Sequence, residues 1–114
     1  MAGMTLEQFE AEVTVACAAS PAVRGVSVVS SGITFLCLRA HLTGEVFIDA
    51  FQNEATDKTS FALIREDQRI FGADNTGGWH WHPFEDPESH LPADSSVRFA
   101  EFLERAIAYL SLGR

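Results

Sequence analysis

The sequence predicts one α+β domain over residues 1–114, with a five-stranded antiparallel meander sheet flanked by an N-terminal and a C-terminal helix. The chain has 114 residues and is 46% hydrophobic, which suits one domain with one core. The two ends carry apolar residues at helical spacing. Between them lie short β-rich runs whose connections are too short for crossover helices, so neighbouring strands should pair antiparallel.

The first helix is expected over residues 5–19. Thr5 and Gln8 have the spacing of a capping box, in which each side chain accepts a hydrogen bond from the other residue's backbone N–H. Pro21 prevents the helix from continuing. The residues of its apolar face are Leu6, Phe9, Val13, Ala16 and Cys17.

The strands are separated by short polar and glycine-rich turns. We expect them at residues 23–29, 33–41, 45–52, 59–65 and 69–73. The following segment, 74–94, contains three of the four prolines and is expected to form a long irregular loop.

The second helix is expected from Ser95 or Ser96 to about Leu112, capped by one of these serines or by Asp94. Gly113 stands where a helix commonly ends. Its apolar stripe should pack with the first helix on one face of the sheet.

Charge and hydropathy limit the possible functions. The net charge is −8, and no basic patch is visible in the sequence, which counts against extended binding to nucleic acid but still allows one or two arginines to hold a single phosphate. No apolar run could span a bilayer and no signal-peptide pattern precedes the first helix, so we expect a cytoplasmic protein without a membrane partner. Cys17 and Cys37 are expected to be core-facing thiols.

The segment GGWHWHPFEDPESH, residues 77–90, holds three of the four histidines and both tryptophans. Pro83 favours extended backbone at the residue before it. Side chains alternate in extended backbone, so His80 and His82 should lie on one face and the two tryptophans on the other. The preceding Asp-Asn-Thr-Gly-Gly has turn chemistry and is expected to aim the histidines.

Acid–base chemistry is one interpretation of this segment. His80 and His82 could act as acid and base in the cleavage of an RNA phosphodiester by its 2′-hydroxyl, without metal or other cofactor. Asp74 or Glu85 could orient the imidazole rings. Arg69 or Arg65 could hold the phosphate; all these assignments rest on residue chemistry alone.

Two other interpretations remain open. His80, His82 and His90 could hold a divalent metal such as zinc, with Glu85, Asp86 or His41 as other candidate ligands. Alternatively, the aromatic residues anchor the loop on the core and the histidines make ordinary hydrogen bonds; those residues are Trp79, Trp81 and Phe84.

The block SFALIREDQRIFGADNTGGWHWHPFEDPESH, followed by the helix FAEFLERAIAYL, resembles the TumE family of small bacterial and archaeal proteins. The similarity extends from Ser60 to Leu110 and includes the strand SFALI, the Arg-Ile-Phe-Gly strand and the histidine-rich segment. It implies the toxin component of a toxin–antitoxin pair, neutralised by a cognate antitoxin that is usually a helix-turn-helix DNA-binding protein.

The sequence also allows a non-enzymatic interaction protein that acts through an acidic surface or an exposed sheet edge. Free sheet edges make a homodimer possible. With RNA as the target suggested by the histidine chemistry, the resulting hypothesis is a growth-inhibiting ribonuclease with the cognate antitoxin as its partner.

Overall fold

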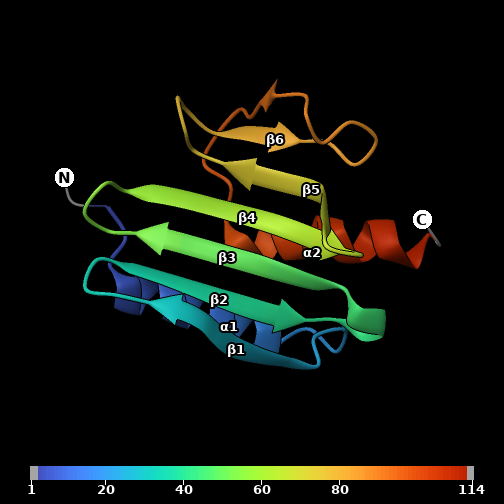
Figure 1. The fold of residues 1–114 in the computed structure, drawn as a ribbon, viewed down its shortest axis with the longest axis horizontal. Coiled ribbons are helices and arrows are strands. Elements are labelled where there is room, and N and C mark those ends of the chain that lie inside the picture. Colours follow the sequence, from blue (N-terminus) through green and yellow to red (C-terminus); the bar gives the residue numbers. More distant parts are fainter. Residues whose placement is uncertain (1–2, 113–114) are drawn as a thin grey trace.

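A computed structural model describes residues 3–112, which form a sheet with two helices on one of its faces (Figure 1). The helices are α1 (Leu6–Ala18) and α2 (Phe99–Ser111), and a short 3-10 turn, η1, spans Thr43–Glu45. The strands are β1 (Gly25–Ser31), β2 (Phe35–His41), β3 (Phe47–Asn53), β4 (Lys58–Arg65), β5 (Gln68–Asp74), β6 (His80–His82) and β7 (Leu91–Pro92).

The strands lie in the sheet in the order in which they occur in the chain, and each pairs antiparallel with the next. This confirms the α+β class and the antiparallel meander. The predicted number of strands is wrong, because β6 and β7 add two strands within segment 74–94, which was expected to be irregular. These strands are three and two residues long, too short to produce an alternating pattern in the sequence.

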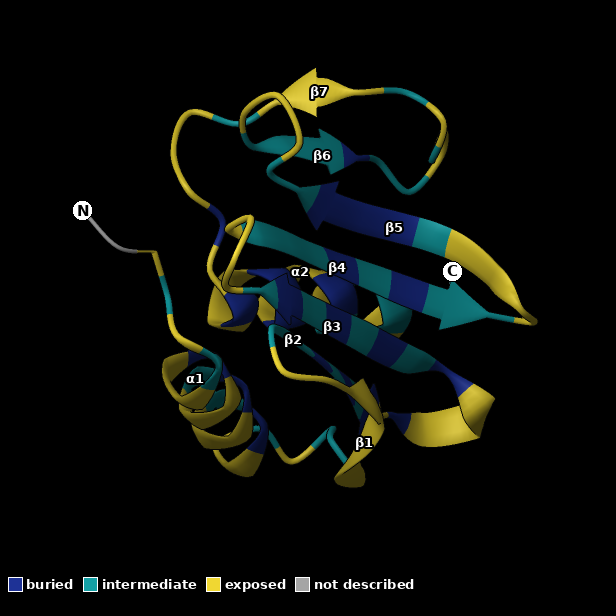
Figure 2. Cartoon of the chain, turned by 60° about the vertical axis from the view of Figure 1, so that its left-hand side comes forward, coloured by how far each residue is buried: buried dark blue, intermediate teal, exposed yellow. Residues whose placement is uncertain are grey.

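The core lies between the sheet and the two helices, which also contact each other. Alternate residues of β2 and β3 are buried against this layer, which gives the banding along the strands in Figure 2. Neither helix of the described residues covers the opposite face of the sheet, which is called the open face below. Neither described helix has the length and apolar character needed to cross a membrane.

The ends of the helices were only partly predicted. Thr5 and Gln8 form the expected capping box: the Gln8 N–H donates to Thr5 Oγ1 at 3.1 Å, and the Thr5 N–H donates to Gln8 Oε1 at 2.9 Å. The predicted start of α2 is wrong, because its N-cap is Arg98 and no side chain caps it. Extended backbone at Arg98 instead leads the chain from buried Val97 into buried Phe99. Gly113 lies outside the described residues.

The two cysteines have different environments. Cys17 is buried on α1, and burial raises the pKa of its thiol to about 11. The prediction that Cys37 faces the core is wrong: alternation along β2 turns its neighbours inward and leaves Cys37 half-buried on the open face. Burial also raises the pKa of Cys37, and the charge of Asp49 adds to this effect while Arg39 opposes it.

Candidate functional site

The pairing of β5 with β6 brings the predicted site residues together. Asp74 lies opposite His80, and Gly72 lies opposite His82. The intervening pair, Ala73 and Trp81, lies on the core side, so both histidines and Asp74 lie on the open face. The expected extended backbone around His-Trp-His is confirmed.

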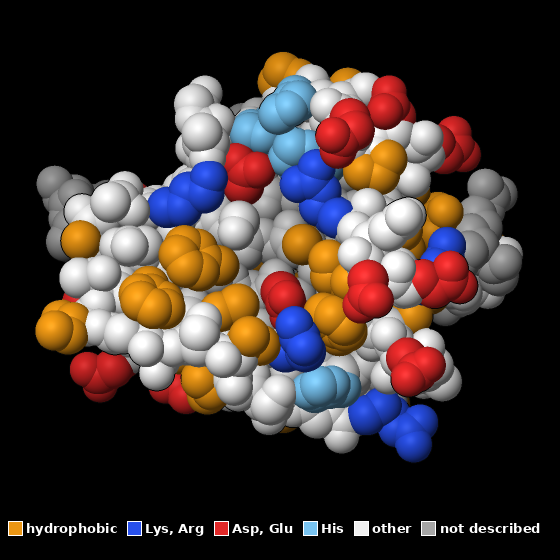
Figure 3. Space-filling view, viewed as in Figure 1, with side chains coloured by type: hydrophobic (Ala, Val, Ile, Leu, Met, Phe, Trp, Pro, Cys, Tyr) orange, Lys and Arg blue, Asp and Glu red, His pale blue; other side chains and the backbone are white. Residues whose placement is uncertain are grey.

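His90 joins these residues from the connection between β6 and β7. Its ring centroid lies 4.8 Å from that of His80 and 4.7 Å from that of His82. One ring nitrogen of each histidine lies within 4.8 Å of the others, so the three residues form a histidine cluster. Figure 3 shows histidine side chains gathered on the open face at the β6 end of the sheet, beside acidic and basic groups.

The carboxylate of Asp74 lies against two members of the cluster. Its Oδ2 is 2.9 Å from His82 Nε2, and its Oδ1 is 3.3 Å from His80 Nε2. Burial by itself raises the pKa of Asp74, but the hydrogen bonds from His82 and the Thr76 N–H and the positive charges of His80 and Lys58 together hold it below its ordinary value. Asp74 is therefore a carboxylate at neutral pH.

Backbone carbonyls engage the other nitrogen of each of these two rings. His80 Nδ1 lies 3.1 Å from the carbonyl oxygen of Gly78, and His82 Nδ1 lies 3.1 Å from that of Pro87. A carbonyl oxygen only accepts hydrogen bonds, so both Nδ1 atoms must donate. Gly78 belongs to the glycine-rich turn that was predicted to aim the histidines, and its carbonyl oxygen contacts His80.

These contacts determine whether each Nε2 atom of a neutral ring carries a proton or a lone pair. A neutral imidazole carries one N–H, so Nδ1 donation leaves a lone pair on each Nε2. The His80 Nε2 is buried and makes no hydrogen bond, since its approach to Asp74 satisfies the distance of an ion pair and not the geometry of a hydrogen bond. In this tautomer both Nε2 lone pairs face the Asp74 carboxylate, so the hydrogen bond between His82 Nε2 and Asp74 needs a proton or an ion at that nitrogen.

Arg69 lies beside the cluster. Its guanidinium donates to the Pro87 carbonyl oxygen at 2.9 Å, the same oxygen that His82 engages, and lies 3.5 Å from the Glu88 carboxylate. The side chain also passes over Gly72, where an added Cβ would lie 3.1 Å from Arg69 Cδ and 3.4 Å from His82 Cδ2. The absence of a side chain at Gly72 therefore leaves room for the side chains of Arg69 and His82.

The remaining predicted residues lie elsewhere. Glu85 lines a hollow beside the end of α2, with Phe84 and Tyr109. Arg65 and His41 line a larger hollow of about 540 Å³, at the other end of the open face. His41 Nε2 there lies 2.8 Å from Ser27 Oγ. Among the described residues, the set of ligand-type side chains close enough to share an ion contains neither Glu85, Asp86 nor His41.

The tryptophans anchor the segment on the core, as one interpretation of the sequence predicted. Trp79 stacks on Phe61 at a centroid distance of 6.1 Å, and Trp81 stacks on Phe71 at 5.5 Å. Phe84 stacks on Tyr109 of α2. The tryptophans can therefore anchor the segment while the histidines form a cluster, because alternation along β6 directs tryptophan and histidine side chains to opposite faces of the sheet.

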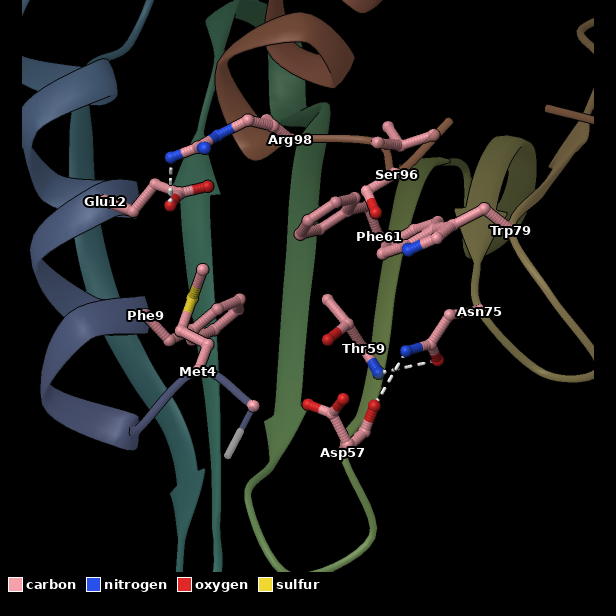
Figure 4. Close-up of a pocket in the computed structure, with 12 residues that line it drawn as sticks. Met4, Phe9, Glu12, Asp57, Thr59, Phe61, Asn75, Trp79, Ser96 and Arg98 are labelled. Carbon is pink, nitrogen blue, oxygen red and sulfur yellow. Dashed lines mark hydrogen bonds and ion pairs between the residues drawn. The ribbon is translucent and has the colours of Figure 1, made fainter. Parts of the chain in front are cut away.

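A third hollow, of about 200 Å³, lies on the helix side of the sheet (Figure 4). Met4 and Phe9 face it from the α1 side, and Trp79 faces it from the other. At its rim Arg98 pairs with Glu12 at 2.8 Å. It contains none of the predicted site residues.

Gly72 and Pro87 were not predicted as parts of the site. They contribute space or a carbonyl oxygen, and neither contribution has a side-chain signature.

Comparisons of the chain with family models, curated proteins and solved structures gave no match. The resemblance to the TumE family and the toxin function it implies therefore stay predictions.

Proposed function

We propose that the protein is an RNA-cleaving toxin of a toxin–antitoxin pair and that cleavage takes place at the histidine cluster. The observation that supports the proposal is the convergence of three imidazoles and the Asp74 carboxylate at one point of the open face. His90 is exposed and can meet a substrate, whereas His82 is almost wholly buried and serves to hold Asp74.

The chemistry needs a proton acceptor and a stabiliser of negative charge. The 2′-hydroxyl loses its proton, its oxygen attacks phosphorus, and the bond to the 5′-oxygen breaks as that oxygen gains a proton. An unprotonated imidazole of the cluster would accept the first proton. Arg69, whose side chain is 36% exposed, would contact the phosphate. With a net charge of −8, contact with RNA should be confined to a few nucleotides.

Replacing His90 with glutamine tests this proposal. We expect induced wild-type protein to arrest bacterial growth and purified protein to cleave a labelled single-stranded RNA, with cleavage about 100-fold slower in His90→Gln. The matched control is His41→Gln, because His41 is exposed and lies outside the cluster. It should retain wild-type cleavage.

Equal cleavage by both variants would exclude the cluster as the active site. A wild-type protein that neither arrests growth nor cleaves RNA would refute the toxin proposal. Circular dichroism of all three proteins guards against loss of folding as the explanation.

A different observation favours an additional role in self-association. All seven residues of β1 are exposed, none is charged, and within the described sheet the strand pairs on one side only. An uncharged edge strand offers its free N–H and C=O groups to another strand. We propose that β1 pairs antiparallel with β1 of a second copy, which gives a closed two-fold dimer.

Replacing Val28, which is 56% exposed, with lysine should convert this dimer to a monomer in sedimentation or light-scattering measurements. The two introduced charges would lie near each other across the dimer axis and repel. Val15→Lys, at a 69% exposed position on α1, should remain dimeric. A monomeric wild type would rule out this dimer.

A further inference from the structure

We infer that the histidine cluster binds one divalent transition-metal ion of the zinc class, with His80 Nε2 and His82 Nε2 as ligands. His90 supplies the third nitrogen, and the Asp74 carboxylate contacts the nitrogens of His80 and His82 beside the site. The inference goes beyond the proposed function and does not depend on it, because metal binding is measured without RNA.

The first argument is the mutual orientation of His80, His82 and Asp74. Both Nδ1 atoms donate to backbone carbonyls, so in the neutral rings both Nε2 lone pairs point toward a carboxylate. Lone pairs and carboxylate oxygens 2.9 and 3.3 Å apart repel each other unless a positive charge lies between them.

Protons are one possible source of that charge, but two would be needed. Protonating both rings would place two imidazolium ions beside one carboxylate, with side-chain exposures of only 13% for His80 and 5% for His82. Two protons and one divalent ion leave the same excess of one positive charge over the Asp74 carboxylate, so net charge does not distinguish them. The ion does distinguish itself at the buried Nε2 of His80, because it would bind this lone pair, whereas a proton there would find no hydrogen-bond acceptor in suitable geometry.

The distances fit a shared coordination sphere. Ligands about 2.0–2.1 Å from zinc at tetrahedral angles lie about 3.4 Å apart. The two nitrogen–oxygen separations at Asp74 are 2.9 and 3.3 Å, and the three histidine nitrogens lie within 4.8 Å of one another. Closure around an ion thus requires a movement of about 1.4 Å at most, which the exposed His90 can supply from its loop.

The surroundings of the rings support the same conclusion. Metal-ligating histidines almost always donate their second N–H to a carboxylate, a carbonyl or water, which fixes the ring and its tautomer. The Gly78 and Pro87 carbonyls do this for His80 and His82. Three imidazoles with one carboxylate favour zinc-like ions over magnesium or calcium, which prefer oxygen ligands.

The test uses full-length protein freed of metal with a chelator and titrated with Zn²⁺ in a calorimeter. We expect one equivalent to bind, and His80→Ala to weaken binding at least 100-fold. Asp74→Asn, nearly equal in shape, should weaken it by about 10- to 100-fold. Co²⁺ in place of Zn²⁺ should give the visible absorption of a tetrahedral site in wild type and not in His80→Ala.

The matched control is His41→Ala, which removes a histidine outside the cluster and should bind Zn²⁺ like wild type. Absence of stoichiometric binding to wild type would overturn the inference, as would equal weakening by His80→Ala and His41→Ala. Circular dichroism establishes that each variant is folded.

A parallel assay of RNA cleavage, with and without Zn²⁺, separates this inference from the proposed function. Metal binding without cleavage would uphold the inference and count against the ribonuclease proposal. Cleavage by a protein that binds no metal would support the ribonuclease proposal and overturn the metal inference.

Discussion

Replacing Phe102 with alanine is expected to lower the free energy of unfolding by about 3–5 kcal/mol. Phe102 is fully buried on α2 and joins the helix layer to the sheet. Its ring lies 4.8 Å from that of Phe71, 5.4 Å from that of Phe61 and 6.4 Å from that of Trp81, measured between centroids. Alanine would leave a cavity among large rigid rings that cannot collapse to fill it.

Urea unfolding followed by circular dichroism measures this loss. The control is Phe35→Ala, because Phe35 lies half-buried on the open face and stacks on one ring, that of Phe51, 6.2 Å away. Phe35→Ala should lower the free energy of unfolding by clearly less than Phe102→Ala does. Equal losses would mean that the core between sheet and helices is not the main source of stability.

Replacing Gly72 with valine is expected to disrupt the histidine cluster while the fold survives. A Cβ at this position would lie 3.2 Å from the backbone oxygen of Phe61 and 3.4 Å from His82 Cδ2, and the extra methyl groups of valine would press further on the histidine. Overpacking of this kind costs about 1–3 kcal/mol of unfolding free energy. Displacement of His82 from Asp74 should also weaken Zn²⁺ binding at least tenfold.

The measurements are urea unfolding, zinc calorimetry and the ¹⁵N resonances of the histidine rings, which report on the His82–Asp74 contact whether or not metal binds. Gly25→Val is the matched control, since a Cβ on this strand glycine would meet nothing within 4 Å. Unchanged His82 ring resonances in Gly72→Val would show that the glycine does not set the position of the histidine.

The features of the fold that could be predicted depend on neighbours in the chain. The capping box at Thr5 and the stop at Pro21 place α1 to within a residue, and Pro83 correctly indicates the extended backbone of β6. The pairing of β6 with β5 and of β7 with β6 could not be predicted, because segments of three and two residues have no alternating pattern that indicates a partner. The start of α2 depends on the burial of Val97 and Phe99, which outweighs the local preference for a serine or aspartate cap.

The candidate site was predictable in its residue types but not in its geometry. His80 and His82 on one face follow from alternation along an extended chain. The contact of Asp74 with both rings follows from the register of β5 with β6, and sequence alone does not determine that register. The separation of Glu85 and Arg65 from the cluster likewise depends on where the loops lie in the folded chain.

The chain-order meander also determines how the molecule should fold. Every strand pairs with the strand next to it in the chain, so the contacts between strands are local in sequence, which favours rapid pairing. The histidines lie on or beside the last and shortest strands, which have few ladder hydrogen bonds to lose. This end of the sheet therefore has the fewest backbone hydrogen bonds, and the cluster should be the last part of the native structure to assemble.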